Sequence, residues 1–187
     1  MSILDEIVAV KKKEVEKNKR EKPLAELKGD LKGSGRDFRG ALQGKTIQLI
    51  GEIKRISPVR GVLRKTFDPV ALARAYQKSG AASLSILTDE PFFGGHLAFI
   101  ERIKAAVTLP LLRKDFILDD YQVYESASAG SDAILLISSL LAQKDLGRLL
   151  TLSKTLGMAS LVEAHTEDDL QKALDAGAEI IGINNRN

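Results

Sequence analysis

Charged and amide side chains stand at the ends of several short apolar runs in this sequence. Glu52 and Lys54 end the run IQLIGEIK, Lys114 ends LPLLRK, Glu163 lies in SLVEA, and Asn184 follows EIIGI. One such group alone is usually solvated. Burying several ions is costly unless they pair, so a cluster of them usually marks a functional site. Because both signs are present, the pattern suits general acid and general base catalysis on an anionic substrate.

The apolar runs alternate with helical patterns along the chain. Six strands are expected, at residues 47–54, 82–87, 109–114, 132–137, 158–163 and 178–184. The helices expected between them span 69–79, 96–107, 120–129, 141–156 and 167–176, and an amphipathic helix over 2–20 precedes the first strand. Strands and helices in this rhythm are typical of βα units and a parallel sheet.

Local signals mark the ends of these helices. A glycine that ends a helix just before a strand is expected at Gly80, Gly130, Gly157 and Gly177. An N-cap followed by a first-turn proline is expected at Asp68-Pro69. Capping boxes are expected for Asp119 with Gln122 and for Thr166 with Asp169.

Successive side chains of a strand point to opposite faces, so each strand can be divided into two sets. One set is almost entirely apolar: Ile47, Leu49, Ile53, Leu84, Ile86, Leu111, Ile134, Leu136, Val162, Ile181 and Ile183. The other set contains the five chemical residues and becomes charged toward the carboxyl ends of the strands. A doubly wound sheet would need two apolar faces, whereas a barrel carries its active site at the carboxyl ends of its strands. The pattern therefore favours a barrel.

Composition limits the class of protein. A chain of 187 residues with 44% hydrophobic residues can form one domain with a core, or one domain with an appendage. It has no cysteine, which excludes disulfides, thiolate metal sites and a cysteine nucleophile. His96 and His165 are too far apart for a helical zinc motif. These counts argue against a thiolate metal site and a helical zinc site.

Charge and hydropathy argue against nucleic-acid and membrane partners. The net charge is +3, and residues 11–22 alone carry seven basic and three acidic side chains, so the rest of the chain is slightly acidic. Nucleic-acid binding would favour a wider basic field and more than 5% aromatic residues. No apolar run reaches the ~20 residues of a membrane span, and the first residues do not resemble a signal peptide. We expect a cytoplasmic protein.

Five segments, in order, resemble the indole-3-glycerol phosphate synthase family of tryptophan biosynthesis. They are EIKRISP (52–58), TDEPFFGG (88–95), LLRKDFILDDYQV (111–123), LVEAH (161–165) and GINNRN (182–187). The resemblance implies an α/β fold of the (β/α)8 TIM-barrel type, here truncated to about six βα units. Residues 1–45 would then form an N-terminal helical extension, and residues 46–187 a partial barrel with strands 1 to 6.

The resemblance also implies a reaction and roles for individual residues. A carboxy-lyase of this family closes the ring of 1-(2-carboxyphenylamino)-1-deoxyribulose 5-phosphate and releases carbon dioxide and water, so the resemblance implies no metal and no organic cofactor. Lys114 would be the general acid in ring closure and Glu163 the general base in dehydration. Lys54 would bind the substrate carboxylate, with a second acid role in some accounts, and Glu52 would hold the lysines. Substrate contacts are implied for Asn184, Ser57, Phe93, Phe116, Leu135 and Arg186.

The length of the chain raises a question about activity. A complete barrel of this type needs eight strands and ~250 residues, and its last two units normally supply most of the phosphate site. We therefore expect a weakly active or inactive chain whose open sheet edges favour self-association. One alternative is a structural or folding module with no catalysis of its own. A second, a phosphoribosylanthranilate isomerase, would usually need a cysteine that is lacking here.

Overall fold

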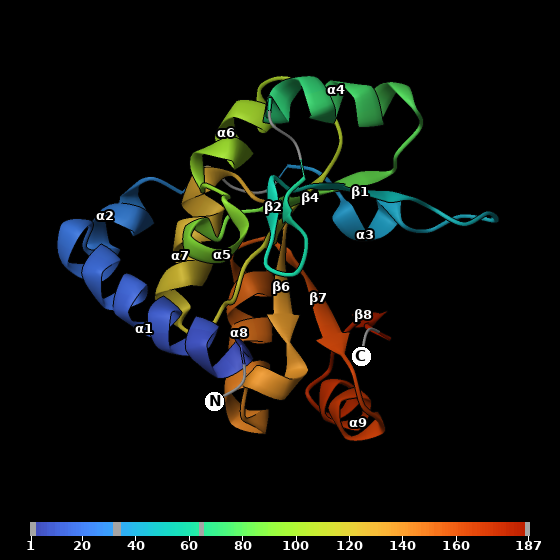
Figure 1. Ribbon diagram of the computed structural model, residues 1–187. Helices are drawn as coiled ribbons and strands as arrows, with labels where there is room; N and C mark the ends of the chain where they lie inside the picture. Colours follow the sequence, from blue (N-terminus) through green and yellow to red (C-terminus); the bar gives the residue numbers. More distant parts are fainter. Residues whose placement is uncertain (1–2, 32–34, 64–65, 186–187) are drawn as a thin grey trace.

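Six parallel strands form the centre of the molecule. The computed structural model describes residues 3–31, 35–63 and 66–185. The strands pair in sequence order, and they are β1 (Ile50–Ile53), β4 (Ser83–Leu87), β5 (Leu111–Lys114), β6 (Ala133–Ile137), β7 (Ala159–Ala164) and β8 (Ile180–Ile183). Helices cover one side of this sheet (Figure 1). The result is an α/β fold of the TIM-barrel type, as the alternation of strand and helix patterns predicts.

Five longer helices follow the predicted ranges closely. They are α4 (Pro69–Lys78), α6 (Ala98–Lys104), α7 (Asp120–Ala129), α8 (Gln143–Thr155) and α9 (Glu167–Asp175). The N-terminal part contains α1 (Ile3–Glu21), α2 (Leu24–Gly29) and α3 (Phe38–Ala41). Short elements that sequence periodicity did not predict are α2, α3, α5 (Glu90–Phe93), the 3₁₀ turn η1 (Ser138–Leu140) and a hairpin of β2 (Ile56–Ser57) and β3 (Gly61–Val62). Elements of two to six residues are too short to show a hydrophobic period.

The predicted helix ends are confirmed. The Asp68 carboxylate accepts hydrogen bonds from the first-turn amides of α4, and both capping boxes, at Asp119 and at Thr166, are formed. The four glycines that follow helices, Gly80, Gly130, Gly157 and Gly177, all have positive φ, between 74° and 86°. Only glycine adopts this conformation without strain, which explains why the chain turns from helix to strand at these positions.

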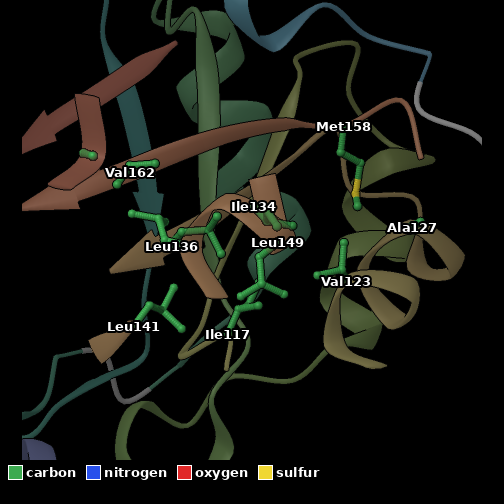
Figure 2. Close-up of a cluster of buried hydrophobic side chains, with 11 residues drawn as sticks. Ile117, Val123, Ala127, Ile134, Leu136, Leu141, Leu149, Met158 and Val162 are labelled. Carbon is green, nitrogen blue, oxygen red and sulfur yellow. The ribbon is translucent and has the colours of Figure 1, made fainter. Parts of the chain in front are cut away.

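The apolar face of the sheet packs against the helices. Ile53, Leu84 and Ile86 form one buried cluster with residues of α4 and α6. Ile134 and Val162 belong to a second cluster (Figure 2), in which β6 and β7 meet α7 and α8. All five side chains are almost completely buried. A buried side chain of this size contributes about 1.5–3 kcal/mol through the hydrophobic effect.

The start of the first strand was predicted wrongly. The expected strand began at residue 47, but β1 begins at Ile50, where pairing with Ser83 starts. Ile47 and Leu49, assigned to the apolar face, are 100% and 56% exposed. Residues 44–46 form a bend, and the Gln48 amide is hydrogen bonded to Thr46. Alternation of side chains in the sequence cannot show where a strand begins, because the first paired residue depends on the position of the neighbouring strand, here β4.

The N-terminal segment packs against α7 and, through α3, against the sheet. Helix α1 lies beside α7 (Figure 1), where the Tyr121 hydroxyl donates to the backbone oxygens of Asn18 and Lys22. Farther along, Phe38 of α3 is buried with Leu112 and Ala133 of the barrel. These contacts join the segment before β1 to residues about 75 to 100 positions away. Helices α1 and α2 form a hydrophobic cluster with α7, and α3 forms one with β5 and β6. The proposed division at residue 45 therefore separates sequence regions that are packed together.

The two edge strands lead to a prediction about association. Within the described residues, β1 is paired only with β4 and β8 only with β7. Open strand edges can pair with another chain. We expect the 187-residue chain to associate at rising concentration, as measured by size exclusion with light scattering. Ile183→Lys places a charge on the exposed edge strand and should reduce association.

Val59→Lys is the matched control, because Val59 is equally an exposed apolar residue but lies in the turn between β2 and β3. A chain that stays monomeric over a hundredfold range of concentration would contradict the prediction.

Candidate functional site

Two of the predicted site residues, Lys114 and Asn184, contact a third, Glu163, at the carboxyl end of the sheet. Lys114 is the last residue of β5, Glu163 lies in β7, and Asn184 follows β8. The Lys114 ammonium is 3.5 Å from Glu163 Oε2, and the Asn184 amide nitrogen donates to Glu163 Oε1 over 2.9 Å. The side chains of Lys114 and Glu163 remain 29% and 22% exposed. The ammonium of Lys114 and the carboxylate of Glu163 are therefore adjacent, partly buried and still accessible.

Glu52 and Lys54 form a separate ion pair at the carboxyl end of β1. The Lys54 ammonium donates to Glu52 Oε1, and the Tyr76 hydroxyl of α4 donates to the backbone oxygen of Glu52. Glu52 is in register with Ser85 of β4. In the part of the chain that the structure describes, no hydrogen bond or ion pair joins this pair to Lys114 or Glu163. The structure therefore places the pair on the same face of the sheet, but as a second group.

The predicted contact residues lie in loops and strands around these groups. The rings of Phe93 in α5 and Phe116 after β5 are 6.1 Å apart. Leu135 of β6 is buried, and its alternation with Ile134 places it on the inner face. Ser57 lies half-buried in the short β2–β3 hairpin that follows β1. Arg186 lies outside the described residues.

A buried ionic cluster lies directly behind the loops of this site. The Lys11 ammonium of α1 is 2.9 Å from Asp115 Oδ1 and 3.1 Å from Asp89 Oδ2. On the other side, the Arg113 guanidinium is 3.0 Å from Asp115 Oδ2 and 2.8 Å from Glu125 Oε2. The side chains of Lys11, Asp89 and Asp115 are each 1% exposed. These residues form a buried connection from α1 through β5 to α7.

The cluster keeps Asp115 and Lys11 charged. Burial alone would raise the pKa of Asp115, but the charges of Arg113 and Lys11 lower it from 3.8 to about 2. Burial lowers the pKa of Lys11, and the carboxylates of Asp115 and Asp89 outweigh this effect and raise it above its ordinary value. The pKa of Glu14, which also contacts Lys11, is raised mainly by burial. Opposite charges within about 4 Å are the cause of the first two shifts.

Sequence reasoning missed this cluster, although two signals were present. Lys11 stands between Ile7 and Val15 at a spacing of four residues, so it lies on the buried stripe of α1 rather than on its basic face. Arg113 shares the parity of Leu111 and is the one charged residue on that face of β5. A charge at an otherwise apolar position requires a buried partner.

Two classes of feature are absent from residues 3–31, 35–63 and 66–185. No group of three or more histidine, aspartate or glutamate side chains is arranged to hold a metal ion. No helix in these ranges has the length and apolar character needed to cross a bilayer.

Comparison with known proteins gives the family. The sequence profile of the indole-3-glycerol phosphate synthase family matches residues 4–187. The chain belongs to this family. It is 48% identical over 186 residues to indole-3-glycerol phosphate synthase of Thermoanaerobacter pseudethanolicus, a match that covers 98% of this chain and 71% of the relative. The family predicted from the five sequence segments, which belongs to tryptophan biosynthesis, is thereby confirmed.

Other relatives show similar coverage. The synthases of Roseiflexus sp. RS-1 and of Burkholderia ambifaria are each 47% identical to this chain, and the matches cover 99% of it. The same matches cover 72% and 73% of the two relatives. A solved structure from Agrobacterium tumefaciens, assigned as a glycerophosphoryl diester phosphodiesterase, has a TM-score of 0.53 at 19% identity. The match covers 73% of this chain and 53% of the chain in that structure, and at this identity it supports the fold alone.

The low pKa of Asp115 predicts how stability changes in acid. Its folded pKa of about 2 lies below its ordinary value of 3.8. Its contribution is therefore complete above about pH 4 and is lost as the pH falls toward 2. Since one pKa unit corresponds to about 1.4 kcal/mol, the contribution is about 2 kcal/mol. Urea unfolding between pH 5 and pH 2 should show this additional loss in the natural protein but not in Asp115→Asn.

Asp168→Asn is a suitable control, because Asp168 is an exposed residue in the first turn of α9. It should keep the pH dependence of the natural protein. An unchanged acid slope in Asp115→Asn would show that the cluster does not hold this carboxylate ionised.

Proposed function

We propose that this chain supplies the acid and base groups of the indole-3-glycerol phosphate synthase reaction. In that reaction, 1-(2-carboxyphenylamino)-1-deoxyribulose 5-phosphate is converted to indole-3-glycerol phosphate, carbon dioxide and water. The observation that supports the proposal best is the contact of Lys114, Glu163 and Asn184 at the carboxyl ends of three strands. Active sites of this barrel type are built at that end of the sheet.

Lys114 acts as the general acid in ring closure. The aromatic carbon that bears the carboxylate forms a bond to the ketone carbon, and the ketone oxygen takes the proton of the Lys114 ammonium. The carboxyl group then leaves as carbon dioxide, and its bonding electrons restore the aromatic ring. Glu163, 3.5 Å from Lys114, keeps the ammonium oriented toward the substrate. A positioned acid of this kind contributes about 10²- to 10⁴-fold to rate.

Glu163 acts as the general base in dehydration. It removes a proton from the ring carbon next to the nitrogen, while the hydroxyl formed in the first step leaves as water. The Lys54 ammonium can donate the second proton that this hydroxyl needs. Asn184 donates to Glu163 Oε1, which fixes the carboxylate and leaves Oε2 toward Lys114. The acid of ring closure and the base of dehydration thus come from different strands, β5 and β7.

The residues around Lys114 and Glu163 bind the aromatic ring and the carboxylate of the substrate. Phe93, Phe116 and Leu135 form apolar walls that press the ketone carbon toward the aromatic ring, which is a positioning effect. Lys54 binds the substrate carboxylate, and Glu52 holds Lys54 through their ion pair. Ser57 and Arg186 are proposed as further polar contacts. A phosphorylated, anionic substrate agrees with two lysines at one end of the sheet.

The chain matches only part of the length of its relatives, which affects the activity expected of it alone. It spans 71% of the length of the Thermoanaerobacter synthase that it matches. We propose that the 187-residue chain has weak turnover or none by itself, and that the remaining segment of that relative, added as a separate polypeptide, raises it. The alternative, a folding module without catalysis, rests on the same coverage and predicts no turnover in either condition.

Substitution of Lys114 tests the assignment of the acid. Lys114→Ala should lower the turnover obtained with the added segment by about 10²- to 10⁴-fold, because proton donation to the ketone is lost. Turnover is followed by the fluorescence of the indole product. Glu163→Gln should cause a comparable loss while the intermediate that has lost carbon dioxide accumulates, since only dehydration is blocked.

Lys154→Ala is the control, because Lys154 is an exposed lysine of α8 that is paired with Glu179. It should leave turnover unchanged. Turnover that survives Lys114→Ala would remove Lys114 as the acid, and no turnover of the unsubstituted chain with the added segment would favour the folding module.

A further inference from the structure

Lys11 connects the two loops that carry the proposed site residues. Its ammonium contacts Asp89, in the loop after β4, and Asp115, in the loop after β5, at 3.1 and 2.9 Å. Both carboxylates and the lysine are 1% exposed, so water does not separate them. Glu14, one turn along α1, holds the same ammonium at 2.9 Å. A residue of the N-terminal helix therefore lies between two loops of the barrel.

Each of these two carboxylates fixes its own loop. Asp89 caps α5, where its Oδ1 accepts a hydrogen bond from the Phe92 amide over 2.9 Å. This cap sets the position of the neighbouring Phe93. Asp115 accepts from the amide of Phe116 over 2.8 Å and directly follows Lys114. The two loops meet where the Phe93 and Phe116 rings lie 6.1 Å apart.

The second oxygen of Asp115 is held from the opposite side. It accepts from the Thr88 hydroxyl over 2.6 Å and from Arg113 over 3.0 Å. Arg113 in turn donates to Ser126 and to the backbone oxygen of Gln122, both in α7. Asp115 is thus held by Arg113 on the barrel side and by Lys11 on the α1 side. Among the described residues, Lys11 is the only cation paired with Asp89.

Without the ammonium, the loops would lose their common contact. Asp89 and Asp115 both lie within about 3 Å of one nitrogen, so they are close to each other and repel when that charge is removed. The repulsion acts between the loop of Phe93 and the loop of Phe116. A displacement of about 1 Å in such groups can lower a rate about 10²-fold.

We propose that Lys11 is a positioning residue, which holds the loops after β4 and β5 in the arrangement that the Lys114 acid and the Phe93–Phe116 wall require. This inference rests on the proposed function of Lys114. It also assigns a role to helix α1, which otherwise lies outside the barrel. Lys11 touches no reacting atom; it acts through Asp89 and Asp115.

The test compares Lys11→Met with Lys17→Met in the full 187-residue chain. Lys17 is the matched control, because it is also on α1 and pairs with Glu21 of the same helix at 3.6 Å, and no ion pair in the described residues joins it to either loop. Hydrogen exchange of the Phe92 and Phe116 amides is measured relative to the amides of α9. In Lys11→Met, both amides should exchange at least tenfold faster than in the natural protein, and in Lys17→Met they should be unchanged.

Turnover gives the second measurement, with the added segment present. Lys11→Met should lower kcat about 10- to 100-fold with KM changed less than threefold, because binding groups remain while their alignment is lost. Lys11→Met is also compared with Lys11→Met/Asp89→Asn, in which the repulsion is removed and the asparagine still caps α5. The double variant should regain thermal stability but neither kcat nor slow exchange at Phe116.

The outcomes separate the two proposals. Unchanged exchange at both amides in Lys11→Met, or recovery of kcat together with stability in the double variant, would overturn the positioning role. Absence of turnover in the unsubstituted chain with the added segment contradicts the proposed function instead. In that case the exchange measurement, which needs no turnover, still shows whether Lys11 holds the two loops.

Discussion

Alternation of side chains along six parallel strands decides which face of the sheet each polar side chain of these strands occupies. In β6 and β7, Ile134 and Val162 point to the helices and are fully buried, whereas their neighbours Leu135 and Glu163 point to the other face. A slip of one residue in register would exchange these faces. The apolar packing under the helices therefore fixes the register, and the register in turn presents the ionisable groups at one end of the sheet.

Arg113 is the exception to the apolar character of the helix-facing side of β5, and its charge requires a set of buried ion pairs. It occupies the helix-facing side of β5 next to Leu111, where an unpaired charge would cost several kcal/mol. The guanidinium is instead satisfied by Asp115, Glu125 and the hydroxyl groups of Thr88 and Ser126. Because these partners come from two strand ends and from α7, the charge connects elements that the apolar packing alone would only place side by side.

Local sequence predicted the parts of this structure that local interactions determine. Caps at Asp68, Asp119 and Thr166 and the glycines with positive φ involve residues within four positions of one another, so a single sequence shows them. The start of β1 depends on pairing with Ser83, about 30 residues away, and was predicted three residues too early. The Lys11 cluster joins positions about 100 residues apart, and only an unexplained charge on an apolar stripe could have indicated it.

The same distinction separates the two parts of the candidate site. The alternation along the strands was enough to predict that Lys114 and Glu163 share a face, because each lies within its own strand. It could not predict that the loop after β5 is held from behind by Lys11, since that contact depends on how α1 packs. Well-packed apolar residues of the same size often stabilise a fold as well as a buried ion cluster does. They lack the directional hydrogen bonds with which Asp115 fixes the Phe116 amide, so the geometry of the loop, more than its stability, is what the buried charges determine.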